Sequence, residues 1–189
     1  MRIRAAVLER TGAQLVVQEL ELAPPGPGEV LVRLRASGIC HSDQNAIDGV
    51  AEARCPAVLG HEGAGVVEEI GPGVRRVAVG DHVALSWAPS CGECAECLRE
   101  LPHLCSTAWP AMGAGTLFDG TTRLSRDGEP IYHYSFISSF ADACVLPERS
   151  CVPIAKDVPF AVAGLVGCAV STGVGAVWRT AAGGCRWTS

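Results

Sequence analysis

Short apolar runs separated by turn residues fill the first 150 residues of the chain. The segments that this pattern predicts as strands are 2–9, 15–22, 29–36, 63–74, 79–86, 140–148 and 151–155. In the third of these, Val30, Val32 and Leu34 fall on one face and arginines on the other. Many short strands with Gly/Pro turns predict a mainly β fold with some α, built as a barrel or a sandwich.

A different pattern begins at Asp157, in the sequence DVPFAVAGLVGCAVSTGVGAVWRTA. Asp157 and Pro159 suit a helix N-terminus, and the internal glycines predict a helix in two parts. No charged residue occurs from 158 to 178, a length that can cross a bilayer. Because many of its residues are small or polar, we favour a helix packed inside a larger protein and expect no membrane partner. Residues 106–139, within the strand-rich part of the chain, are expected to be irregular.

Composition narrows the function classes. The chain has 189 residues, 48% apolar and 19% charged, with a net charge of -5. A packed core is therefore feasible, and the absence of a Lys/Arg block argues against a nucleic-acid partner. The N-terminal sequence MRIRAAVLER does not resemble a secretory signal, so we expect a cytoplasmic protein. Its ten cysteines are then expected to be metal ligands or catalytic groups rather than disulfides.

Four of these cysteines lie within residues 88–106, in the spacing Cys-x2-Cys-x2-Cys-x7-Cys. They are Cys91, Cys94, Cys97 and Cys105. This spacing predicts a tetrahedral structural zinc site with no open position. Two alternatives are a disulfide cluster, which needs particular loop geometry, and an iron–sulfur cluster, whose last cysteine is usually followed by proline. Here Ser106 follows, and zinc is favoured.

A second set of possible ligands lies in the motifs GICHSDQN, VLGHEGAGVV and LVGCAVSTGVGA. Taken singly each is weak, because Cys40 fits a buried thiol and His61 fits a turn histidine with satisfied hydrogen bonds. Together, Cys40, His61 and Cys168 make a Cys2His set with one zinc position left open, the arrangement known from alcohol dehydrogenase.

These motifs, with GHEGAGVVEEIGPGV, GDHV, DGTTR and the cysteine lobe, resemble in order and combination the zinc-dependent, medium-chain alcohol dehydrogenases. The nearest likeness is to the class III branch, which includes glutathione-dependent formaldehyde dehydrogenases. The resemblance covers residues 1 to about 180. It implies a GroES-like β-barrel catalytic domain in 1–155 with a structural-zinc lobe at 88–106. The start of an inter-domain helical region in 156–180 and then a Rossmann domain would follow.

The resemblance also implies roles for individual residues. Cys40, His61 and Cys168 would bind the catalytic zinc, and the four lobe cysteines the structural zinc. Ser42 would relay the substrate proton, Asp43 would orient His61, and Glu62 would coordinate the metal transiently. Trp87 would line the substrate pocket, His41 would meet the cofactor pyrophosphate, and Thr172 would touch the nicotinamide.

The implied reaction is oxidation of a primary alcohol, or reduction of an aldehyde. Zinc would lower the pKa of the bound hydroxyl, and the resulting zinc alkoxide would pass hydride to NAD. In some members of the family the proton relay ends in a histidine, and this sequence has Asn45 at that position. Because an amide is not a base at neutral pH, the proton would have to leave by another route. His41 is only partly charged near pH 7, which weakens a pyrophosphate contact.

The chain shows no G-x-G-x-x-G motif after a strand, so the expected Rossmann domain is absent from it. We therefore expect a fragment, truncated or frame-shifted near residue 180, with 181–189 a non-native or disordered tail. On this hypothesis the chain alone is inactive, binds about two zinc ions, and belongs to a full-length form that is a homo-oligomer. One alternative is a non-catalytic zinc module for partner binding or redox sensing. Another is a zinc-free quinone-reductase-like protein, which the intact ligand set disfavours.

Overall fold

The computed structural model describes residues 1–181, which form short strands and helices joined by loops. The strands are β1 Arg2–Leu8, β2 Val16–Leu22, β3 Glu29–Ser37, β4 Ala57–Val58, β5 Gly63–Ile70, β6 His82–Leu85, β7 Leu124–Arg126, β8 Glu129–His133, β9 Ala143–Pro147 and β10 Cys151–Pro153. The helices are α1 His41–Asp48, α2 Ala95–Leu98, α3 Ala108–Ala114, α4 Phe160–Ala163 and α5 Ser171–Gly175. Shorter helical turns are η1 Pro102–Leu104 and η2 Glu148–Ser150, and two π-helical segments are η3 Val166–Val170 and η4 Ala176–Ala181.

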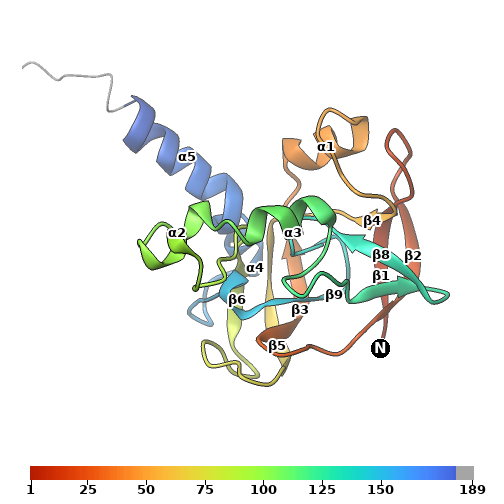
Figure 1. The fold of residues 1–189 in the computed structure, drawn as a ribbon, viewed down its shortest axis with the longest axis horizontal. Helices are drawn as coiled ribbons and strands as arrows, with labels where there is room; N and C mark the ends of the chain where they lie inside the picture. The colour runs from red at the N-terminus through yellow and green to blue at the C-terminus, as the bar shows by residue number, and fades with distance from the viewer. Residues whose placement is uncertain (182–189) are drawn as a thin grey trace, which may run out of the picture.

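Two five-stranded sheets make up the body of the molecule (Figure 1). One closes into a barrel in the order β1-β2-β7-β8-β4, because β4 pairs with β1 on one side and, in parallel, with β8 on the other. The other has the order β10-β6-β5-β3-β9. The prediction of a mainly β, barrel-type fold with a C-terminal helical segment is confirmed.

Alternation along the strands explains the core of the barrel. On β1 the side chains of Ile3, Ala5 and Val7 are buried, while Arg2 and Arg4 are exposed and Ala6 is half-buried. These apolar side chains pack with Leu20 of β2 and Ile131 of β8 in one cluster. Because a strand turns successive side chains to opposite faces, this pattern places one face inside the barrel and the other in water.

Strand β3 departs from the simple alternation that its sequence predicts. Val30 and Val32 are fully buried as expected, but Leu31 between them is also only 3% exposed. The register against β5 shifts between Leu31 and Val32 and again between Leu34 and Ala36. Leu31 packs in the cluster of the barrel, whereas Val30 and Val32 pack in a separate cluster, so both faces of the first half of β3 are covered. Here tertiary packing overrides the period of two.

The expectation that residues 106–139 are irregular was wrong. This region contains helix α3 and the antiparallel hairpin β7–β8. The turn of the hairpin is Asp127-Gly128, with φ angles of 53° and 82°. Asp-Gly with both residues in the left-handed region is a strong hairpin signal. The sequence therefore held the signal for this hairpin, but the short strands beside it lack clear alternation.

The C-terminal helical segment begins on the second sheet. Ala163 of α4 packs against Ala64 of β5 and Ala84 of β6, and the Phe160 ring lies 4.6 Å from that of His82. From there Phe160–Ala181 forms a 22-residue helix with mean hydropathy 1.9, long and apolar enough to cross a membrane. Only 11% of its apolar window is buried. Figure 1 shows this helix extending away from the sheets.

Two sequence expectations for the C-terminal region have different outcomes. The helix in two parts is present only in the sense that α-helical and π-helical segments alternate along one continuous run. The predicted tail at 181–189 lies, apart from Ala181, outside the described residues, as does Cys185.

Candidate metal centres

The four lobe cysteines lie together, as their spacing predicts. Their sulfur atoms are all within 4.8 Å of one another, with Cys91 Sγ 3.9 Å from Cys97 Sγ and Cys94 Sγ 3.8 Å from Cys105 Sγ. A tetrahedral zinc with bonds of about 2.3 Å requires sulfurs about 3.8 Å apart. A disulfide requires about 2 Å, so none of these cysteines is disulfide-bonded.

The loop around the lobe donates hydrogen bonds to the sulfurs. The backbone N–H groups of Glu93 and Cys94 point at Cys91 Sγ, at 3.4 and 3.3 Å, and Cys91 N–H points at Cys105 Sγ at 3.3 Å. With the Thr107 side chain as the largest contributor, such bonds lower the pKa of Cys91 to about 6. Metal binding needs the thiolate, so this backbone favours the form that binds.

A second cluster joins residues from three segments of the chain. Cys40 precedes α1, His61 and Glu62 precede β5, and Cys168 lies in η3. One ligand atom from each lies within 4.8 Å of the others. The three sequence motifs, weak when taken singly, thus converge on one point. We call the group of Cys40, His61, Glu62 and Cys168 the open cluster.

Asp43 connects two members of the open cluster. It is 1% exposed, and its Oδ1 accepts hydrogen bonds from His61 Nδ1 at 3.2 Å and from Gly60 N–H at 3.1 Å. Its Oδ2 accepts one from Cys40 N–H at 3.0 Å. Holding His61 through Nδ1 directs Nε2 toward the cluster. Burial lowers the pKa of His61, but the hydrogen bond and charge of Asp43 raise it more.

The environment of Glu62 indicates that this cluster fits a cation. The side chain is 1% exposed, yet its Oε2 has no hydrogen-bond partner. A buried carboxylate oxygen without a partner costs free energy, and a cation among the two sulfurs and the imidazole would satisfy it. Space for Glu62 depends on Gly38, because a Cβ there would lie 2.1 Å from Oε2. The donor set of two thiols, one imidazole and one carboxylate suits zinc.

Cys168 reaches the cluster because its helix lies very close to β6. A Cβ on Gly167 would be 2.0 Å from the carbonyl oxygen of Leu85, so only glycine allows this approach. Burial, and then the nearby Cys40, raise the pKa of the Cys168 thiol to about 12. Burial also acts on Cys40, but hydrogen bonds from Ser42 and His61 outweigh it and lower the pKa of Cys40. The two thiols therefore differ in their environments.

Tyr134 lies beside the open cluster, although the sequence did not single it out. Its ring packs edge-on against His61 with centroids 5.9 Å apart, and its hydroxyl donates to the Ser42 carbonyl at 3.1 Å. Burial first, then Asp43 and the two cysteines, raise its pKa to about 12, so the hydroxyl keeps its proton. The aromatic-rich sequence YHYSF was the only local signal. Nothing in it placed the ring beside His61.

The remaining predicted site residues are Ser42, Trp87, His41 and Thr172. The Ser42 hydroxyl is exposed and 3.7 Å from Cys40 Sγ. Trp87 is partly buried and follows β6. Its ring packs edge-on against that of Trp109, with ring centroids 6.2 Å apart. His41 begins α1 and Thr172 lies in α5; both are exposed. Their assigned roles stay predictions.

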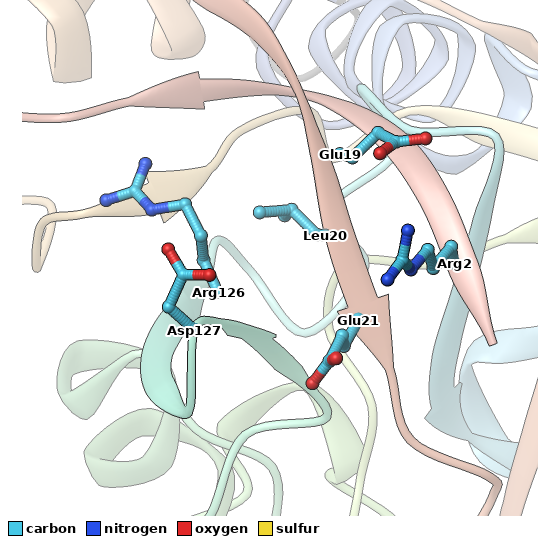
Figure 2. A pocket seen from close by; sticks show the side chains of 6 residues that line it. All are labelled: Arg2, Glu19, Leu20, Glu21, Arg126 and Asp127. Atoms are coloured by element: carbon cyan, nitrogen blue, oxygen red, sulfur yellow. The ribbon is translucent and has the colours of Figure 1, made fainter.

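A hollow of about 200 Å³ elsewhere on the barrel contains none of these residues. Figure 2 shows its charged walls, which come from β1, β2 and the β7–β8 turn. Arg126 there is bonded to Glu9 and Gln18, which hold its guanidinium. Charges of both signs line it, and no cluster of metal-ligating side chains within residues 1–181 lies in it. We assign it no site.

Comparison with known proteins agrees with this geometry. Residues 26–156 match the family model of the alcohol dehydrogenase GroES-like domain. The chain belongs to this family. It is 45% identical over 183 residues to an alcohol dehydrogenase class-3 from Cereibacter sphaeroides and to an S-(hydroxymethyl)glutathione dehydrogenase from Paracoccus denitrificans. In each case the match covers 96% of this chain and 49% of the relative, so the chain spans about half the length of these curated relatives.

Solved structures of alcohol dehydrogenases have the same fold. The crystal structure of an alcohol dehydrogenase zinc-binding domain protein from Burkholderia ambifaria has a TM-score of 0.89 and 38% identity, over 96% of this chain and 50% of that one. Benzyl alcohol dehydrogenase from Acinetobacter calcoaceticus has a TM-score of 0.86 and 38% identity, over 95% and 48%. The resemblance to zinc alcohol dehydrogenases of class III is thus confirmed, and a zinc-free quinone-reductase-like protein is not supported.

Proposed function

We propose that this chain is the catalytic domain of a zinc-dependent oxidoreductase that interconverts a primary alcohol and its aldehyde, with NAD as the hydride partner. The open cluster carries this proposal. Cys40, His61 and Cys168 meet at one point, with a buried and unpartnered carboxylate oxygen of Glu62 beside them. A scaffold without chemistry has no use for an incomplete ligand set, so a purely non-catalytic module is disfavoured.

Two zinc ions would be held by the two clusters. The four sulfurs of the lobe would surround one ion and leave no place for a substrate, so this site would be structural. The open cluster would hold the second ion through Cys40, His61 and Cys168, with Glu62 in reach. When bound there, zinc supplies Lewis-acid chemistry to the oxygen of an alcohol or aldehyde.

The side chains around the open cluster would then orient the reactants and move the proton. Asp43 keeps the His61 ring in place through the bond to Nδ1. The Ser42 hydroxyl, exposed and next to Cys40, would accept the proton of the substrate hydroxyl and pass it outward. Asn45 is no base, so water would take the proton onward. Trp87 would form part of the wall against the substrate carbon chain.

Cofactor contacts are part of the same proposal. His41 and Thr172 are both exposed; His41 would meet the pyrophosphate of a bound dinucleotide, and Thr172 would touch its nicotinamide. Within residues 1–181 the strands pair antiparallel except for β4 with β8, so the described part contains no doubly wound parallel sheet. We therefore propose that the 189-residue chain binds both zinc ions but does not reduce NAD on its own.

Metal analysis of the purified chain tests this proposal. We expect about two zinc ions per chain, and about one in Cys168→Ser, because that change removes a ligand from the open cluster only. A count of one in the unchanged chain would contradict the catalytic assignment. Assay with alcohol and NAD tests the rest: clear NADH production by the 189-residue chain would overturn the proposed inactivity while leaving the zinc sites standing.

A further inference from the structure

Three hydrogen-bond donors surround the backbone carbonyl oxygen of Glu62. The N–H of Gly38 lies 3.1 Å from this oxygen, the Oγ of Ser37 2.9 Å and the Oγ of Ser139 3.0 Å. The two serine hydroxyls are also 2.7 Å apart, so they form a hydrogen bond with each other. We call Ser37 and Ser139 the serine pair. None of the roles proposed above uses these two side chains.

Only two protons are available for the contacts between the serine pair and the carbonyl. Each hydroxyl donates one proton, and a carbonyl oxygen has two lone pairs. If one hydroxyl donates to the other, one proton remains for the Glu62 carbonyl, and the Gly38 N–H fills its second lone pair. Because both hydroxyl oxygens lie within 3.0 Å of this carbonyl, either serine can donate to it. The serine pair is therefore partly redundant.

Ser139 is 2% exposed and follows a strained segment of backbone. In this segment Ser135, Phe136 and Ser138 have φ angles of 51°, 63° and 55°, in the left-handed region. Residues other than glycine are unfavourable there and persist only where their surroundings hold them, often at functional sites. The Ser139 N–H donates to the Gly60 carbonyl at 3.0 Å, and a Cβ on Gly60 would lie 2.5 Å from Ser139 Oγ. The fold thus tolerates strain and close packing to place this hydroxyl.

The side chain of Glu62 depends on its backbone for its position. Within residues 1–181 its Oε2 has no hydrogen-bond partner, whereas Asp43 holds the neighbouring His61 through Nδ1. Close packing limits the Glu62 carboxylate on one side, because a Cβ on Gly38 would lie 2.1 Å from Oε2. The carbonyl that the serine pair contacts is therefore a polar group by which the fold holds Glu62.

We propose that the serine pair positions Glu62 for the cation of the open cluster. This inference rests on the proposed function, because it requires a metal ion at that cluster. Hydrogen bonds to the carbonyl fix the peptide group after Glu62 and so restrain the backbone from which the carboxylate extends. Ser37 and Ser139 would act only through Glu62, which makes them positioning residues. The alternative is that they only stabilise the fold, by joining the end of β3 to the segment before β9.

Zinc titration of the purified chain with a chromophoric chelator tests this inference without turnover. Ser37→Ala or Ser139→Ala should weaken zinc binding at the open cluster about threefold, because one hydroxyl remains. Both changes together should weaken it roughly 30-fold, more than the two single effects combined, and leave the lobe zinc bound. Ser37→Thr with Ser139→Ala keeps one hydroxyl and should behave like Ser139→Ala. Ser150→Ala is the matched control, because Ser150 is fully buried and its Oγ has no hydrogen-bond partner within residues 1–181.

The same changes in a Glu62→Gln background separate positioning from stability. The double alanine variant should have little effect on zinc affinity there, because the carboxylate that the serine pair positions is gone. An equal loss of affinity in both backgrounds would show that the pair supports only the fold and would overturn the inference. Unchanged zinc affinity in the double variant would overturn it too.

Thermal melting shows whether the double variant folds. If it does not, Ser139→Ala decides the question in the two backgrounds. A threefold loss with Glu62 and none with Gln supports the inference, and the same loss in both contradicts it. If the unchanged chain binds only the lobe zinc, the proposed function fails and this inference fails with it. If the unchanged chain binds two zinc ions and the serine variants bind both as tightly, only the positioning role fails.

Discussion

The two metal clusters differ in how their ligands are distributed along the chain. The lobe takes all four sulfurs from residues 91 to 105, and local backbone N–H groups support them. The open cluster takes its ligands from residues 40, 61, 62 and 168, which only the folded sheets and the C-terminal helix bring together. The first is a local structure that adds stability, and the second is a product of tertiary packing.

Because of this difference, we expect substitutions in the two clusters to have different effects. A change in the lobe should affect folding, because a metal bound there would take the place of a hydrophobic core that so short a loop cannot build. A change near the open cluster should affect metal affinity and leave the rest of the molecule folded, because the barrel and sheet are held by their own apolar side chains. The following variants test this contrast.

The largest effect is expected from Cys97→Ser in the lobe. Loss of one sulfur should release the structural zinc and lower the free energy of unfolding by several kcal/mol. This is a part of the ~10–16 kcal/mol with which structural sites bind zinc. Thermal melting and zinc content measure it. Cys55→Ser is the control, since Cys55 lies in neither cluster. An unchanged melting temperature would show that the lobe does not depend on metal.

Gly167→Ala should break the open cluster while sparing the lobe. Its Cβ would lie 2.0 Å from the Leu85 carbonyl, so the helix carrying Cys168 must move away from β6. Such overpacking costs about 1–3 kcal/mol, which corresponds to roughly tenfold to 100-fold weaker zinc binding at the open cluster. Zinc titration with a chromophoric chelator measures this. Gly173→Ala in the same helix, where a Cβ meets nothing within 4 Å, should change nothing.

Asp43→Asn tests the link between Cys40 and His61. The amide cannot accept from His61 Nδ1, Gly60 N–H and Cys40 N–H as the carboxylate does. We expect zinc affinity at the open cluster to fall roughly tenfold to 100-fold, with the lobe zinc retained. Asp48→Asn on the exposed side of the same helix is the control. Equal zinc affinity in Asp43→Asn and the unchanged chain would remove Asp43 from the site.

The smallest effect comes from pH and concerns the barrel rather than either cluster. His133 is buried, and burial, followed by the charge of Arg123, lowers its pKa from 6.5 to about 3, with Asp119 opposing. Below pH 6.5 the unfolded chain therefore binds a proton that the folded protein does not. This contribution is complete above pH 6.5 and is lost as the pH falls toward 3, about 2 kcal/mol by pH 5.

Urea unfolding at pH 7 and pH 5 measures this dependence. His133→Gln should lose the part of the pH dependence that belongs to this histidine, whereas His103→Gln, at an exposed position, should keep it. Comparing variants at the same pH cancels the loss of zinc that acid causes in all of them. If His133→Gln and the unchanged chain lose the same stability between the two pH values, this histidine does not carry the effect.

Several elements followed from the sequence because their signals are local. The strands β1, β2, β5 and β6 lie where short apolar runs between turns predict them. The lobe likewise follows from the spacing of its cysteines. The hairpin β7–β8 carried a local Asp-Gly signal that was missed. The burial of Leu31 followed no local rule, because this side chain packs in the barrel cluster, on the opposite face from Val30 and Val32.

The open cluster could not be predicted from any single motif. Cys40, His61 and Cys168 could be grouped only through resemblance to a family, since no period or spacing relates them. Tyr134 was missed altogether because its contact with His61 crosses from one loop to another. Gly38 and Gly167 matter because they have no Cβ, which leaves space for Glu62 and for the Leu85 carbonyl. The sequence alone does not show which atoms lie beside a glycine in the fold.

By itself, then, the sequence determined the β-rich body, the helical C-terminal segment and the four-sulfur lobe. Each depends on interactions between residues close in the chain, which periodicity and spacing record. Only the tertiary structure decided that Asp43 bonds both Cys40 and His61 and that Glu62 Oε2 is buried without a hydrogen-bond partner. These depend on close approach of distant segments, set by the packing of whole sheets and one helix.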